Sequence, residues 1–79
     1  MNDSTTRRHT GDEGDIYFNA VIGPYETAFS AIKLLGIRTV YDIDAKLAEA
    51  EAEAVQQGFE PTGEGREIVR RELRDTLEA

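Results

Sequence analysis

The fold of this chain is decided by residues 39–58, TVYDIDAKLAEAEAEAVQQG. Thr39 and Asp42 have the spacing of a capping box, in which a threonine hydroxyl and an acidic side chain satisfy free amide groups at the start of a helix. Apolar side chains then recur at helical spacing at Val40, Ile43, Leu47, Ala50 and Ala54. The Ala/Glu alternation over residues 48–54 has the period of a strand, but both residue types are strong helix formers and poor strand formers. We therefore expect a helix over residues 40–57 that Gly58 ends. The many alanines of this helix would let another helix approach closely.

A shorter helix is expected before this one, over residues 24–35. Pro24 suits the first helical position, where a missing amide hydrogen costs no hydrogen bond. An amphipathic face follows at Tyr25, Ala28, Phe29, Ile32 and Leu35. Gly36 comes directly afterwards and suits the left-handed backbone that commonly ends a helix.

A third helix is expected over residues 66–78, after a loop. Pro61, Gly63 and Gly65 interrupt regular structure over residues 59–65, FEPTGEG. Beyond this loop the apolar residues are Ile68, Val69, Leu73 and Leu77. The arginines at positions 66, 70 and 74 are four residues apart and share one side of the helix. We expect carboxylates of residues 40–57 to meet these arginines, which would orient the two helices antiparallel.

Residues 16–22, IYFNAVI, carry a different pattern. Apolar residues alternate along them in β-favouring types, which predicts a strand. A single strand leaves its backbone donors and acceptors without partners, and the rest of the chain carries no second strand pattern. Two interpretations remain open: the segment pairs with its copy across a homodimer, or it is an extended arm or short helix that lies on the other helices. Residues 1–15 are polar and without periodicity, and we expect them to form a disordered tail.

Together these elements predict a mainly α fold, a small three-helix domain over residues 16–79 with a short extended segment or strand before the helices. The chain has 79 residues and no cysteine, so disulfides, thiolate metal sites and cysteine nucleophiles are excluded. The single histidine, His9, lies in the expected tail, where no neighbour would hold it in catalytic geometry. No stretch is apolar enough to span a membrane. We therefore expect a cytoplasmic protein that is not an enzyme and uses no cofactor or metal.

The negative charge of the chain is concentrated in one region. The formal net charge is −7, and residues 39–65 alone carry seven carboxylates against Lys46, a charge of −6. A solvated helix face accounts for such a run without any function. A binding surface would instead use the charge to attract a basic site on a partner. Under that second interpretation the candidate binding residues are Asp42, Glu49, Glu51, Glu53, Glu60 and Glu64.

The leading functional hypothesis is a protein–protein interaction module, an adaptor or inhibitor that occupies the surface of a protein partner through its acidic helix. In the inhibitor form, the helix mimics nucleic acid and competes for the basic groove of a nucleic-acid-binding protein, as antagonists encoded by phages and plasmids do. The lack of catalytic side chains and the local acidity both favour this class over an enzyme.

Two resemblances support a different class, a DNA-binding transcription regulator. Residues 28–43 resemble the first half of a helix-hairpin-helix unit, as found in the C-terminal domain of the bacterial RNA polymerase α subunit and in lesion-bypass DNA polymerases. The matching residues are Ala28, Ile32, Gly36, Ile37, Arg38, Thr39, Val40, Asp42 and Ile43. The order of strand, helix, glycine turn and capped helix is similar to a ribbon-helix-helix repressor, which pairs its strands across a dimer. These resemblances imply nucleic-acid contacts through Tyr17, Asn19 and Arg38, although the acidity of the chain opposes contact with phosphates.

Overall fold

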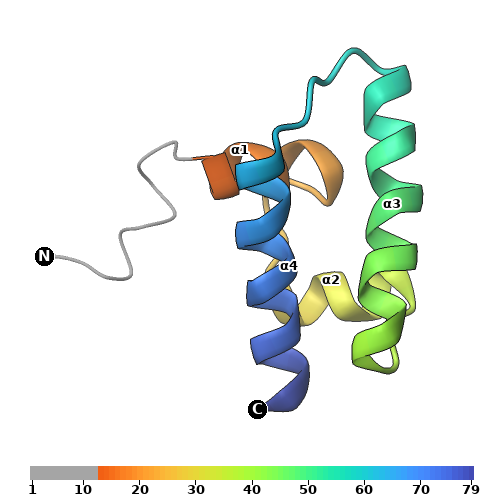
Figure 1. Ribbon diagram of the computed structural model, residues 1–79, viewed down its shortest axis with the longest axis vertical. Helices are drawn as coiled ribbons and strands as arrows, with labels where there is room; N and C mark the ends of the chain where they lie inside the picture. The colour runs from red at the N-terminus through yellow and green to blue at the C-terminus, as the bar shows by residue number, and fades with distance from the viewer. Residues whose placement is uncertain (1–12) are drawn as a thin grey trace, which may run out of the picture.

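The computed structural model describes residues 13–79, which form four helices and no strand. The helices are α1 (Glu13–Val21), α2 (Ala28–Leu35), α3 (Val40–Gln56) and α4 (Gly63–Glu78). Helices α3 and α4 run antiparallel, and α2 crosses between them near the start of α3 (Figure 1). The α class predicted from the sequence is confirmed, but the predicted number of helices is one too few. Of the tail predicted over residues 1–15, positions 1–12 lie outside the described residues and positions 13–15 belong to α1.

The hydrophobic core lies where α4 meets the other helices. The three most extensive helix–helix contacts all include α4, and the largest of them joins α4 to α1. The buried apolar side chains of the core are Tyr17, Phe18, Ala31, Ile37, Ile43, Leu47, Val69 and Leu73. Val69 and Leu73 of α4 are fully buried at the centre of this cluster. Helix α4 is therefore the element against which the other helices pack.

Helix α1 occupies the segment for which the sequence predicts a strand, residues 16–22. Tyr17 and Phe18 are neighbours in the chain and each is 1% exposed, whereas a strand would point successive side chains to opposite faces. Val21, three residues after Phe18, packs against the same core, as the helical period requires. A helix satisfies its backbone hydrogen bonds internally, so this segment needs no second strand. The predicted strand is wrong, and so is the interpretation in which strands pair across a homodimer. The alternative of a short helix that lies on the other helices is confirmed.

Helix α2 begins at Ala28, four residues after the predicted start at Pro24. Its N-cap is Thr27, whose hydroxyl oxygen accepts a hydrogen bond from the backbone N–H of Ser30 at 3.0 Å. Pro24 lies in the preceding turn instead. The predicted end is confirmed: Gly36 adopts a left-handed backbone with φ of 76°, and its N–H donates to the carbonyl oxygens of the last turn.

Helix α3 follows the prediction closely and ends at Gln56, one residue early. The capping box at its start is present, and Asp42 Oδ2 accepts hydrogen bonds from the backbone N–H groups of Arg38 at 2.9 Å and Thr39 at 3.1 Å. At the other end, Gly58 has a φ of 103°, and the N–H of Phe59 donates to the carbonyl oxygen of Ala54. Both ends of this helix are thus set by the local signals that the sequence shows.

Helix α4 begins at Gly63, three residues before the predicted start at Arg66. Thr62 is its N-cap, and the hydroxyl oxygen of Thr62 accepts a hydrogen bond from the N–H of Gly65 at 3.0 Å. The same hydroxyl donates to the carboxylate of Glu13 at 2.9 Å, which joins the start of α4 to the start of α1. The prediction of a loop continuing through Gly65 is wrong. The helix begins at the Thr62 cap even though Gly63 and Gly65, which have low helix propensity, occupy its first turn.

Candidate functional site

The six acidic residues predicted as a binding surface occupy three parts of the structure. Four of them lie on α3, one lies in the following loop, and one lies in the first turn of α4; in chain order they are Asp42, Glu49, Glu51, Glu53, Glu60 and Glu64. Successive α3 residues point in different directions because each is rotated about 100° around the helix axis. Asp42, Glu49 and Glu53 are seven and four residues apart and share one side of α3, whereas Glu51 points toward Arg66 of α4. The six carboxylates together therefore do not form a single face.

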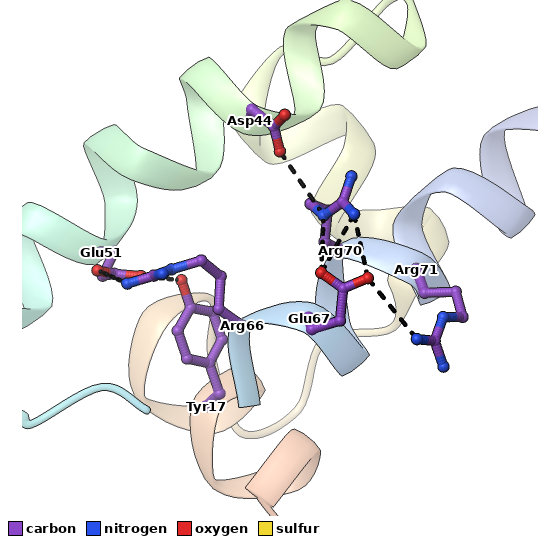
Figure 2. A network of polar contacts seen from close by, with 7 residues as sticks. All are labelled: Tyr17, Asp44, Glu51, Arg66, Glu67, Arg70 and Arg71. Carbon is purple, nitrogen blue, oxygen red and sulfur yellow. Dashed lines mark hydrogen bonds and ion pairs between the residues drawn. The ribbon is translucent and has the colours of Figure 1, made fainter. Parts of the chain in front are cut away.

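Glu51 is engaged in a network that joins three helices (Figure 2). Its carboxylate accepts a hydrogen bond from the hydroxyl of Tyr17 on α1 at 2.5 Å. Arg66 of α4 donates to both carboxylate oxygens, from Nε and Nη2, at 2.8 Å each. The side chain of Glu51 is only 16% exposed. Glu51 thus connects α3 to α1 and α4, and its charge is already neutralised by Arg66.

The electrostatics of this network follow from its contacts. The hydrogen bonds from Arg66 hold the pKa of the Glu51 carboxyl below its ordinary value, against the opposing effect of partial burial, and the Tyr17 hydroxyl adds to the lowering. Burial raises the pKa of Tyr17 well above its ordinary value, and the neighbouring Glu51 carboxylate raises it further. Glu51 is therefore a carboxylate and Tyr17 a neutral hydrogen-bond donor at neutral pH.

A second network lies further along α4 and involves Arg70 (Figure 2). The guanidinium of Arg70 donates to Glu67 at 3.0 to 3.2 Å and lies 3.9 Å from Asp44 of α3. Glu67 also pairs with Arg71 at 3.6 Å. The expectation that α3 carboxylates meet the arginines of the last helix is confirmed for Glu51 and Asp44. The arginine spacing indicates this pairing, whereas no signal in the sequence points to Tyr17, which lies 34 residues from Glu51.

Asp42 has a local role at the start of α3. Its carboxylate accepts the backbone N–H groups of Arg38 and Thr39, and these hydrogen bonds hold its pKa below the ordinary value. A carboxylate in this position also interacts favourably with the positive end of the helix dipole. Asp42 therefore stabilises the helix whether or not a partner binds.

Glu49 and Glu53 are the exposed acidic residues of α3 that remain. Within residues 13–79, neither makes an ion pair or a side-chain hydrogen bond. Two shallow hollows lie beside them, one of about 350 Å³ toward Val21 and Phe59 and one of about 210 Å³ toward Leu34. Glu53 and Ala50 line both hollows. Lys46 lines the smaller hollow together with Glu49 and Glu53. This side of α3 thus combines exposed carboxylates that make no ion pair with hollows lined by both polar and apolar side chains.

The three residues of the DNA-binding alternative differ in their exposure. Tyr17 is 1% exposed and its hydroxyl donates to Glu51, so it does not face outward toward a DNA groove. Asn19 on α1 and Arg38 before α3 are both exposed. The contact set implied by a ribbon-helix-helix resemblance depends on an outward strand, and in its place the structure has helix α1.

Two kinds of feature are absent from the described part of the chain. Residues 13–79 contain no cluster of three or more acidic or histidine side chains arranged to hold a metal ion. No helix among them has the length and apolar character needed to cross a bilayer. His9 lies outside the described residues. Comparisons of the chain with protein-family models, with curated proteins and with solved structures gave no match.

Proposed function

We propose that this protein is a non-enzymatic protein–protein interaction module, an adaptor or inhibitor that occupies a partner's surface through α3. The observation that carries the proposal is the contrast between the two sides of that helix. Toward α4, Glu51 and Asp44 are compensated by arginines. On the other side, Glu49 and Glu53 are exposed, and the two hollows beside them are lined by both polar and apolar side chains. Exposed carboxylates without an ion-pair partner favour association with a basic protein, because their charge raises the association rate and orients the encounter.

The partner class that fits this surface is a protein with a basic site, such as the groove of a nucleic-acid-binding protein. Residues 39–65 carry a charge of −6, part of which is compensated by Arg66 and Arg70. The field of the remaining carboxylates attracts a basic site that is otherwise occupied by phosphates. An inhibitor of this kind acts by steric occupation and needs no chemistry of its own. An adaptor uses the same surface to hold its partner in place.

The proposal is tested by reversing single charges and measuring capture of partners. Tagged protein carrying Glu49→Lys or Glu53→Lys is compared with the wild type in affinity capture from native host lysate, with identification by mass spectrometry. Glu78→Lys, an exposed glutamate at the end of α4, makes the same charge change away from the surface. We expect a defined set of proteins to be lost with both α3 variants and kept with Glu78→Lys. Equal capture by all variants would refute the proposal, and a salt-dependent shift of duplex DNA by the wild type would support the regulator class instead.

A further inference from the structure

We infer that the outward face of α3 is a docking seam for a helix of the partner, and that this helix is amphipathic with basic residues beside its apolar stripe. The inference rests on the proposed function, because it identifies the partner element that α3 would hold. The docking surface, which we call the seam or the α3 outer stripe, consists of Tyr41, Ala45, Ala48, Ala52 and Val55. These residues follow one another at spacings of four, three, four and three, which places them along one side of the helix.

All five residues of the α3 outer stripe are exposed. Tyr41 is 87% exposed and Val55 is 46% exposed. The buried side of the same helix is formed by Ile43, Leu47 and Ala54. Surface helices normally carry polar residues on the side that faces away from the core. Helix α3 is therefore apolar on two sides, and only one of them is used within residues 13–79.

The shape of the α3 outer stripe suits another helix. Its length from Tyr41 to Val55 corresponds to about 21 Å, or four helical turns. Three alanines lie between the larger side chains at its ends, so the middle of the stripe allows a partner backbone to approach closely. Helix α3 lies at the edge of the molecule (Figure 1), and Ala48 and Ala52 of the stripe line an open hollow together with Arg66 of α4. The stripe is thus long enough and open enough for helix-on-helix packing with heptad spacing.

The charges beside the stripe identify the chemistry of the occupant. By the helical period, Asp42, Glu49 and Glu53 lie along one edge of the stripe and Asp44 lies along the other. Side chains that flank an apolar helix seam set the choice of partner through charge. Lysine or arginine beside the apolar stripe of a partner helix would therefore match the edge that carries Glu49 and Glu53, since Asp44 on the other edge already lies beside Arg70. A second copy of this chain would instead bring two segments of charge −6 together, which repel each other.

The test uses a synthetic three-heptad helical peptide with an apolar Leu/Ala seam and lysines beside it, measured against the full chain by fluorescence anisotropy. The same peptide with glutamates in place of the lysines is the charge control. Ala48→Glu is the decisive variant, because it adds negative charge while it obstructs the middle of the stripe. Asn19→Glu on α1 adds the same charge at an exposed site elsewhere. Circular dichroism checks that each variant keeps its helix content, and Tyr41→Ala is a second variant of the stripe that adds no charge.

We expect the lysine peptide to bind about tenfold or more tightly than the glutamate peptide, Ala48→Glu to lose about tenfold in affinity, and Asn19→Glu to bind as the wild type does. If Ala48→Glu binds the lysine peptide as tightly as the wild type or more tightly, the peptide is held by charge alone, and docking on the α3 outer stripe is refuted. A wild-type dimer in analytical ultracentrifugation that Ala48→Glu dissociates would assign the stripe to a second copy and also refute the inference. If partner capture is lost with Glu49→Lys but kept with Ala48→Glu, the proposed function stands and the seam does not.

Discussion

The backbone carbonyl oxygen of Glu13 lies 2.8 Å from the point that a Cβ atom would occupy at Gly65. The Cβ atom of Tyr17 lies 3.0 Å from the same point, so both neighbours belong to α1. A side chain of any size at position 65 would collide with backbone, which cannot move without shifting the helix. The close contact between α1 and α4 therefore requires a glycine here, in the middle of a helical turn where glycine is otherwise unfavourable.

Gly65→Ala should destabilise the protein by about 1 to 3 kcal/mol, because it overpacks the contact between α1 and α4. Gly63→Ala is the matched control in the same helical turn, where an added Cβ would have no atom within 4 Å. That change should be neutral or stabilising by up to about 1 kcal/mol, since it restricts the unfolded chain. Urea unfolding followed by circular dichroism measures both. Similar values for the two variants would contradict the proposed close contact.

Tyr17→Phe should lower the free energy of unfolding by about 1 kcal/mol, the usual contribution of one hydrogen bond. It removes the hydroxyl that donates to Glu51 and leaves both Arg66 hydrogen bonds in place. Tyr41→Phe makes the same chemical change on a side chain that is 87% exposed, and should change stability by less than about 0.5 kcal/mol. Equal effects at the two positions would show that the hydroxyl of Tyr17 contributes nothing to the fold.

Stability should fall as the pH is lowered below about 5, and Glu51→Gln should weaken that dependence. The pKa of Glu51 is lowered in the folded protein from an ordinary value of 4.5, chiefly by its hydrogen bonds to Arg66. The unfolded chain therefore binds this proton more readily, so the stabilisation is complete above the ordinary value and is lost as the pH falls through the lower, folded value. Urea unfolding at a series of pH values tests this.

Asp42→Asn should also weaken the loss of stability on acidification, and should do so at lower pH than Glu51→Gln. The pKa of Asp42 is lowered from an ordinary value of 3.8, first by the hydrogen bond from the backbone of Arg38 and then by that of Thr39. The sign is the same as for Glu51, because the folded carboxyl again binds its proton less readily than the unfolded one. The same pH series gives the measurement. If the free energy of unfolding of Asp42→Asn changes with pH as it does in the wild type, the charge of Asp42 does not contribute to stability.

Leu73→Ala should destabilise the protein by about 2 to 5 kcal/mol, since it leaves a cavity in the centre of the core. Leu73 is fully buried, whereas Leu34 is 62% exposed and provides the control for the same substitution. A domain of this size has only about 3 to 5 kcal/mol of stability from its core, so Leu73→Ala should unfold much of the population at 25 °C. Leu34→Ala should keep the helical circular dichroism signal and the thermal midpoint. Loss of the fold in both variants would contradict the assignment of the core.

The elements that could be predicted from the sequence are those with local signals. Helix α3 has a capping box at one end and a glycine at the other, and its apolar period extends over four turns. The end of α2 at Gly36 is equally local. Such signals act within one helical turn and need no knowledge of the rest of the fold.

The elements that could not be predicted depend on contacts between distant residues. Over the seven residues of segment 16–22, the apolar pattern fits both the alternation of a strand and the period of a helix. The helix is favoured because it buries both Tyr17 and Phe18. Gly65 has the pattern of a helix breaker until its contact with α1 is known. In the candidate site, the charge pattern indicates the arginine pairing, whereas the position of Tyr17 beside Glu51 depends on the tertiary fold.

The central position of α4 also determines when this protein can fold during its synthesis. A nascent chain that has emerged from the ribosome only as far as α3 lacks Val69 and Leu73, the fully buried residues against which the earlier helices pack. The apolar side chains that the folded protein buries then face solvent or a chaperone. We therefore expect the stable core to form only after α4 has left the exit tunnel, because α4 supplies the side chains that complete it.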